Sequence, residues 1–280
     1  MTITLTIRRE WRTLTKSEQT LFLNTVLKLM ERSDNDHPSF YDLHAKLLGD
    51  NSQAIPAENI KKGGLIHGTP LFLPWYRYFL FLFEKQLQIV EPKLALPYWS
   101  FGLDANNPEL APVWGEEAFG GNGVGEDSAV LDGFFKNWQP LYPTPHHLRR
   151  SWSAGNAIDP FESPEVTHAQ IIRARMYDEL RKALEMRPAG IVRNNIGGDC
   201  LTMYAANDPL FYLFMANIDR LWFKWQLSST AKSKAFDGLM PQNKQKVSLS
   251  DPLPHFSGSV KVSDVIEAKI LGYTYDEVTI

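Results

Sequence analysis

The 280-residue sequence has one cysteine, a formal net charge of only -3 and no uncharged hydrophobic run of membrane-spanning length. A single cysteine, Cys200, excludes an internal disulfide framework, so nothing in the sequence requires an oxidising compartment. The near-balanced charge gives no sign of a nucleic-acid or membrane-surface partner. Charged residues at positions 8–10 interrupt the N-terminal stretch before any signal-like apolar segment, so we expect no signal peptide and a cytoplasmic location.

Aromatic residues are what the sequence has in excess, with 8 Trp, 10 Tyr and 16 Phe. At 44% hydrophobic and 22% charged residues, the composition is otherwise that of an ordinary globular protein. So many rings predict a large aromatic core or a pocket lined by aromatic side chains. No internal repeat and no obvious linker divides the chain, so we expect one domain spanning residues 1–280.

The most informative stretch is residues 67–88. Apolar residues recur there at helical spacing, at Phe79, Leu80, Phe83 and Leu87, and the neighbours at 81–82 widen the stripe. A helix that is apolar nearly all round belongs in the middle of a core. The run acquires charge too soon to be a membrane span, so we expect no membrane partner. His67 and Tyr76 would enter at the buried start of this helix.

The remaining local signals predict a mainly helical chain. Thr15 with Glu18, and Ser39 with Asp42, are capping boxes that open helices. A similar signal, Thr167 with Gln170, predicts a helix that continues to Leu184, and Asp208-Pro209 opens a further one. Residues 91–160 lack periodicity and are interpreted as a loop excursion over a pocket. Short strands are predicted at residues 3–7 and near 270–278.

Six motifs extend this interpretation. They are LPWYRYFLFLFEKQL (73–87), LPYW (96–99), FGGNG (119–123), IGGD (196–199), NDPLFYLFMANIDRLWFKWQ (207–226) and LGYTYD (271–276). In this order they resemble the tyrosinase and catechol-oxidase family of type 3 copper proteins. The resemblance implies a mainly α fold, a four-helix bundle core with long loops and a few short strands. Its central helices would lie at roughly 40–48, 70–90, 187–196 and 209–225.

In that family two trios of histidines hold two coppers, since imidazole is a good copper ligand. The ligand positions correspond here to Leu48, His67, Tyr76, Ala189, Arg193 and Met215, with Phe214 preceding the last. Only His67 is a histidine. Leucine, alanine and arginine cannot ligate copper, and neither a neutral tyrosine nor a lone methionine replaces an imidazole for divalent copper. We therefore expect no metal and no cofactor.

Each of these residues also has a purely structural interpretation. His67 and Tyr76 could be hydrogen-bonded core residues, and Phe214 and Met215 could fill space left by the metal. Arg193 either turns to solvent or an acidic partner, or binds an anionic or carbonyl-bearing ligand. Outside the ligand positions, we expect His44 on the solvated face of its helix, and ion pairs within Arg77–Glu84 and Asp219–Arg220.

Three function classes compete. In the first, a copper-independent enzyme catalyses isomerisation, dehydration or cyclisation of a small aromatic or polyketide-like biosynthetic intermediate. His67, Tyr76 and Arg193 would be its catalytic groups, with Arg193 favouring the phenolate of Tyr76. Substrate would contact Leu48, Ala189, Asn194, Phe214 and Met215. In the second, the protein is a catalytically dead binding or partner protein. In the third, it is a metal-dependent phenol oxidase. Homo-oligomerisation stays open.

Overall fold

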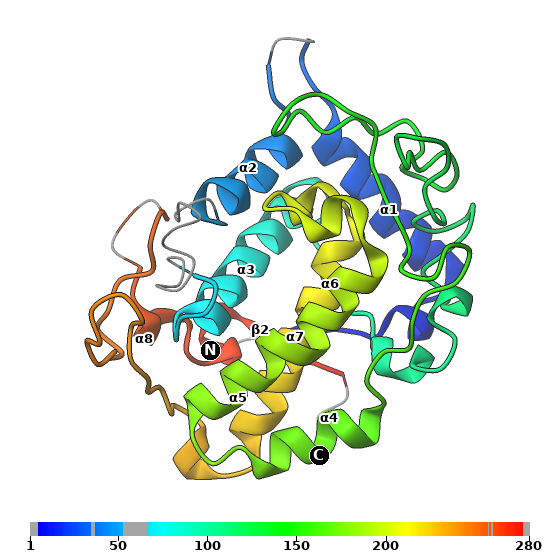
Figure 1. Ribbon diagram of the computed structural model, residues 1–280. Coiled ribbons are helices and arrows are strands. Elements are labelled where there is room, and N and C mark those ends of the chain that lie inside the picture. Colours follow the sequence, from blue (N-terminus) through cyan, green and yellow to red (C-terminus); the bar gives the residue numbers. More distant parts are fainter. Residues whose placement is uncertain (1–4, 35–36, 53–65, 257, 259, 277–280) are drawn as a thin grey trace.

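The computed structural model describes residues 5–34, 37–52, 66–256, 258 and 260–276, and helices dominate it (Figure 1). The helices are α1 (Lys16–Met30), α2 (Phe40–Ser52), α3 (Phe72–Val90), α4 (Pro164–Arg173), α5 (Tyr177–Leu184), α6 (Gly190–Ile196), α7 (Leu210–Leu227) and α8 (Val262–Val265). The strands β1 (Thr6–Arg8) and β2 (Tyr273–Tyr275) pair in parallel. The mainly α prediction is confirmed, and the four predicted central segments fall on α2, α3, α6 and α7.

Local sequence signals explain where the first two helices begin. Thr15 caps α1, and its hydroxyl and the Glu18 carboxylate complete a capping box. Ser39 and Asp42 exchange the same two hydrogen bonds at the start of α2, at 2.9 and 3.0 Å. These reciprocal bonds satisfy backbone N–H groups that the first turn of a helix leaves without partners.

Helices α3 and α7 form the centre of the core. Phe79, Leu80, Phe83 and Leu87 of α3 are all fully buried, as the spacing predicted. In α7, Tyr212 stacks on Phe83 with ring centroids 3.7 Å apart. Stacked rings bury much apolar surface without leaving voids, so part of the aromatic excess of the sequence packs these two helices together.

Buried charges attach the strands to this centre. Arg8 of β1 forms an ion pair with Glu84 of α3 at 3.0 Å, and Arg77 of α3 binds Asp219 of α7 at 2.6 Å. The Tyr275 hydroxyl of β2 also donates to Asp219 at 2.6 Å. Each charge has a partner because an unpaired charge in the core would be strongly destabilising. The two predicted local pairs, Arg77–Glu84 and Asp219–Arg220, are therefore wrong, since both acids bind arginines from other segments.

Two further predictions need correction. Helix α4 begins at Pro164 and ends at Arg173, and its N-cap is Ser163, four residues before the predicted cap Thr167. A break at residues 174–176 separates it from α5, whose N-terminal N–H groups of Tyr177 and Asp178 bind the carboxylate of Asp237. That carboxylate comes from a distant segment, so local periodicity could not predict the break.

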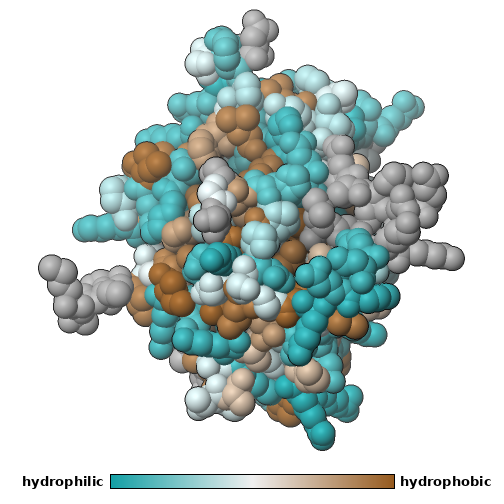
Figure 2. Space-filling view, turned by 90° about the vertical axis from the view of Figure 1, so that its left-hand side faces the viewer, coloured by the Kyte–Doolittle hydropathy of each residue, from teal (hydrophilic) through white to brown (hydrophobic). Residues whose placement is uncertain are grey.

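The segment between α3 and α4 is irregular, as predicted, apart from short 3-10 turns at Phe101–Asp104 and Pro108–Leu110. It runs along one side of the helical core (Figure 1). On the face shown in Figure 2, hydrophobic and hydrophilic residues are interspersed. Among the described residues, no helix is both long enough and apolar enough to cross a membrane.

Candidate functional site

A small cavity lies between the start of α3, the region around α6 and the middle of α7. The described residues that line it are His67, Phe72, Tyr76, Glu185, Ala189, Gly190, Arg193 and Met215. About 30 Å³ of it is open to a water-sized molecule. That is room for about one water or one small functional group. The fold thus brings together five of the residues that the sequence had assigned to a single site.

A line of hydrogen-bonding groups crosses the cavity. The hydroxyl of Tyr76 lies 3.1 Å from Nε2 of His67. On the other side of the ring, Nδ1 of His67 lies 3.5 Å from Oε1 of Glu185. Glu185 is itself held by the N–H of Gly68 at 2.7 Å and by Nη1 of Arg181 at 2.9 Å. Both ring nitrogens of His67 therefore face a polar partner.

The chain between α5 and α6 does not follow a regular α-helix. Residues Glu185–Ala189 form a π-helical turn with Pro188 inside it. Proline has no N–H to donate and its ring crowds the preceding turn, so a widened turn accommodates it within a continuous helical run. This turn places Glu185 and Ala189 on the same cavity as Arg193.

Arg193 is half-buried and is held by the backbone. Its Nε donates to the carbonyl of Cys200 at 2.9 Å, and its Nη2 donates to the carbonyl of Thr202 at 3.1 Å. The sequence left three possible surroundings for Arg193: solvent, an acidic partner or a ligand. In the structure its hydrogen bonds go to backbone carbonyls, and its side chain lines the cavity. Because arginine stays charged in proteins, the cavity has a fixed cation in its wall.

The prediction that Tyr76 is a ready phenolate is wrong. Burial raises the pKa of Tyr76, and this is the largest effect. The positive charge of Arg193 lowers the pKa by less, and the nearby Glu185 raises it further. Removing a phenolate from water is the larger effect in this enclosed position. Tyr76 is therefore a neutral phenol whose O–H can donate to His67.

Three of the predicted substrate contacts are placed elsewhere. Leu48 and Phe214 are buried in the hydrophobic core but are not among the described residues that line the cavity. Phe214 packs on Phe211, because one step along a helix turns a side chain about 100° away from that of Met215. Asn194 is exposed, since it follows Arg193 by the same step.

Glu185 is the residue that the sequence interpretation missed. Positions 185, 189 and 193 recur at intervals of four, which places side chains on one face of a helix. Ala189 and Arg193 of this series were already assigned to the site through the family's ligand positions. Extending the series one turn toward the N-terminus would have found the carboxylate that faces His67.

The histidines of the chain do not gather at this cavity. All seven lie among the described residues, and His67 alone lines it. His44 was expected on the solvated face of α2 but is buried and stacks on Phe79 with ring centroids 4.1 Å apart. Throughout the described part of the chain, no group of three or more His, Cys, Asp or Glu side chains is arranged to hold a metal ion.

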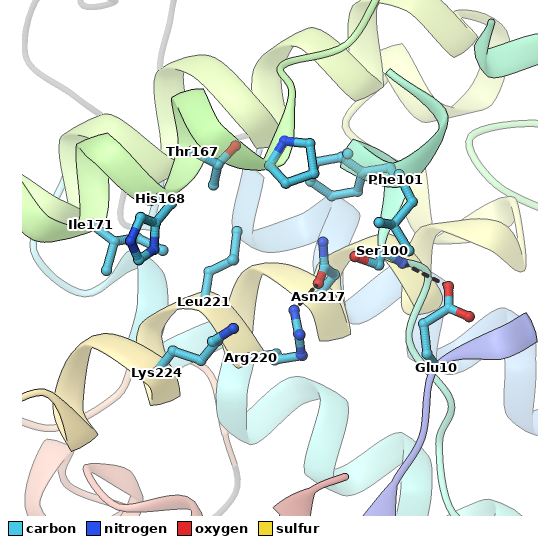
Figure 3. A pocket seen from close by; sticks show the side chains of 13 residues that line it. Glu10, Ser100, Phe101, Thr167, His168, Ile171, Asn217, Arg220, Leu221 and Lys224 are labelled. Carbon is cyan, nitrogen blue, oxygen red and sulfur yellow. Dashed lines mark hydrogen bonds between the residues drawn. The ribbon is translucent and has the colours of Figure 1, made fainter. Parts of the chain in front are cut away.

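A larger hollow, of about 270 Å³, opens on a different face of α7 (Figure 3). His168 and Ile171 of α4 face Leu221 and Lys224 of α7 across it. Arg220 on its floor donates to Asn217 at 3.3 Å and lies over the Tyr98 ring. Residues 100–103 close one end, so the irregular segment after α3 does border a pocket, but not the cavity that contains His67 and Tyr76.

The arrangement of these helices matches that of solved structures. The structure is similar to a polyphenol oxidase from Thermothelomyces thermophila (a G292N mutant), with a TM-score of 0.76 and 20% identity, covering 98% of this chain and 89% of that one. It is also similar to a functional unit of octopus hemocyanin, with a TM-score of 0.65 and 18% identity, covering 98% of this chain and 69% of that one. These likenesses establish the fold.

Sequence comparisons identify the family. The common central domain of tyrosinase matches residues 35–228. Tyrosinase ustQ of Aspergillus flavus is 32% identical over 294 residues, covering 96% of this chain and 79% of that protein. The tyrosinase of Streptomyces antibioticus is 32% identical, covering 79% of this chain and 83% of that protein. Tyrosinase-like protein phomQ1 of Diaporthe leptostromiformis is 31% identical, and the match spans 61% of its length. The chain belongs to the tyrosinase family.

Proposed function

We propose that this protein is a copper-independent, tyrosinase-like enzyme that catalyses a non-redox step on a small aromatic or polyketide-like carbonyl compound. The observation that carries the proposal is the hydrogen bond of 3.1 Å between Tyr76 and His67, inside a cavity that Arg193 also lines. Proton transfer next to a carbonyl uses groups that move the proton and a cation that stabilises the charge on oxygen. The phenol, the imidazole and the guanidinium that line this cavity can take these roles.

The chemistry follows from the order of these groups. Arg193 stabilises negative charge that develops on the carbonyl oxygen of the substrate. The oxygen of Tyr76 takes a proton from the carbon next to that carbonyl while its own proton passes to Nε2 of His67. Reversal of the two transfers returns the proton to another atom of the substrate, which completes an isomerisation. Because about 30 Å³ is open, the substrate inserts one carbonyl-bearing group and leaves its body outside.

The donor set supports chemistry without copper. A pair of coppers needs several imidazoles, and His67 is the one histidine among the described residues that line the cavity. Glu185 is already bound to Arg181, and the guanidinium of Arg193 adds a positive charge where a metal ion would need negative or neutral donors. The residues present do not fit a dicopper centre.

Metal content tests this part of the proposal. After copper loading and removal of free metal, elemental analysis should find no stoichiometric copper, and oxygen-dependent oxidation of tyrosine or catechol should be absent. Two copper ions per chain that disappear on His67→Ala would contradict it.

A biosynthetic role is also part of the proposal. One relative in sequence, grixazone synthase of Streptomyces griseus, is named for a product and is 26% identical over 79% of this chain. That name supports the use of a tyrosinase-like fold to make a small molecule. It does not carry the substrate of that protein over to this chain.

The size of the cavity favours a second candidate function. A volume of about 30 Å³ is far below the few hundred Å³ typical of small-molecule sites. A protein that had lost catalysis and only bound a partner would need no larger space. Proton exchange distinguishes the two functions, since only the enzyme abstracts a proton from carbon.

The experiment is to incubate aromatic and polyketide-like ketones with the protein in D2O and follow deuterium uptake beside the carbonyl by NMR and mass spectrometry. Tyr76→Phe, His67→Ala and Arg193→Met should each slow exchange by about 10²–10⁴-fold. Tyr78→Phe, on the same helix but outside the cavity, should leave the rate unchanged. If all three cavity variants fold and exchange at the wild-type rate, the cavity is not an active site and the binding function takes its place.

A further inference from the structure

We infer that Glu185 is a positioning residue that holds His67 in one tautomer, with Nδ1–H directed at Glu185 and Nε2 free to accept from Tyr76. The observation behind this inference is the arrangement of the carboxylate, the imidazole and the phenol, with separations of 3.5 and 3.1 Å. Its catalytic meaning rests on the proposed function, whereas the tautomer is a property of the protein alone.

Glu185 has a fixed position from which to act. Its Oε1, which faces His67, accepts from the N–H of Gly68 at 2.7 Å, and its Oε2 accepts from Arg181 at 2.9 Å. Gly68 has a φ of 71°, a left-handed conformation that favours glycine and turns this N–H toward the carboxylate. The side chain of Glu185 is 13% exposed, so solvent competes little for its oxygens.

The protonation states of the neighbours select the tautomer. Burial alone would raise the pKa of Glu185, but the hydrogen bonds that it accepts from His67, Gly68 and Arg181 outweigh burial and lower it. An ionised carboxylate only accepts hydrogen bonds, so the ring nitrogen that faces it carries the hydrogen. Tyr76 keeps its proton because burial raises its pKa, and it therefore donates to the other nitrogen. Both neighbours require the same tautomer.

This tautomer is not the one that histidine prefers by itself. In water the neutral side chain favours hydrogen on Nε2, and which nitrogen carries it in a protein is set by the bond that the other makes. The side chain of His67 is 31% exposed, so without Glu185 water could bind Nδ1. Nε2 would then gain the hydrogen and could no longer accept the proton of Tyr76.

The test is nitrogen NMR of the protein labelled with 15N at histidine. In the wild type, at a pH where the His67 ring is neutral, its signals should show hydrogen on Nδ1 and a bare Nε2. Glu185→Ala should move His67 toward the Nε2–H form, and Arg181→Met should shift it part of the way by releasing one oxygen of Glu185. Glu116→Gln changes an exposed carboxylate outside the cavity and should leave the His67 signals unchanged. Circular dichroism establishes that each variant is folded.

Turnover measurements separate this inference from the proposed function. Loss of positioning should lower kcat of Glu185→Ala at least tenfold with little change in KM. The loss should not exceed the roughly 10²–10⁴-fold that the positioned proton-transfer group itself contributes. If the tautomer shifts but no substrate is turned over by the wild type, Glu185 positions His67 and the enzymatic proposal fails. If folded Glu185→Ala keeps the Nδ1–H form, or the wild type already mixes both forms, the positioning role is wrong even where Tyr76→Phe abolishes turnover.

Discussion

Replacement of Arg150 by methionine should destabilise this protein more than any change on its surface. The Arg150 guanidinium is fully buried and binds both carboxylate oxygens of Asp208, at 2.7 and 2.9 Å. Its Nη1 also donates to the carbonyls of Phe119, Gly120 and Gly121, at 2.8 to 3.1 Å. One side chain thus attaches the irregular segment after α3 to the turn that begins α7.

The magnitude follows from what is left behind. Arg150→Met strands the Asp208 carboxylate, which has zero exposed area, and removes the donor to three carbonyls. Breaking a buried ion pair by removing one partner costs about 3–5 kcal/mol, because the remaining charge is uncompensated. We expect a loss of that size in the free energy of unfolding. For a domain of marginal stability this is a large fraction of the total.

Urea denaturation followed by tryptophan fluorescence measures the loss. Arg149→Met is the matched control, because Arg149 is the neighbouring residue but is exposed, and it should change the free energy of unfolding by less than about 0.5 kcal/mol. Asp208→Asn should be much less destabilising in the Arg150→Met background than in the wild type, since the pair acts as a unit. A loss below about 1 kcal/mol for folded Arg150→Met would refute the argument that this pair is a buried, mutually dependent contact.

Two pH dependences should accompany this result. Nδ1 of His146 donates to a backbone carbonyl and Nε2 donates to Asp199, and the bond to Asp199 raises the pKa of His146. The contribution of protonated His146 to the free energy of unfolding should be complete below pH ~6.5 and disappear as pH rises through the raised pKa. Unfolding free energies of His146→Gln at pH 6 to 9 should lack that decline, and an identical decline would contradict the assignment. Burial lowers the pKa of His44 to about 3, so stability should fall on acidification from pH ~6.5 toward that value, because the unfolded chain takes up the proton first. His44→Phe should remove this dependence without loss of stability at pH 7, since Nε2 of His44 has no hydrogen-bond partner among the described residues. If the stability of His44→Phe fell more steeply on acidification than that of the wild type, this explanation would be wrong.

The sequence determined the elements whose signals are local. The apolar spacing of Phe79, Leu80, Phe83 and Leu87 identified the central helix, and Thr15 identified the start of α1. Periodicity and capping depend on residues at most a few positions apart, so a linear pattern contains them. The motif order also gave the family and hence the helices that meet. Tyr76, Arg193 and Met215 could be placed on one cavity for that reason.

The tertiary structure decided which polar groups face each other. His44 is buried although its helix gave no sign of it, and Arg77 binds Asp219 rather than the nearby Glu84. The bond between His67 and Glu185 joins residues more than a hundred positions apart. Partners of this kind depend on how helices are oriented when they pack and on which groups lose contact with water. The same loss of water raises the pKa of Tyr76, where the sequence had suggested a lowered one. A sequence specifies the faces of its helices, but burial and charge pairing exist only after those faces have packed against one another.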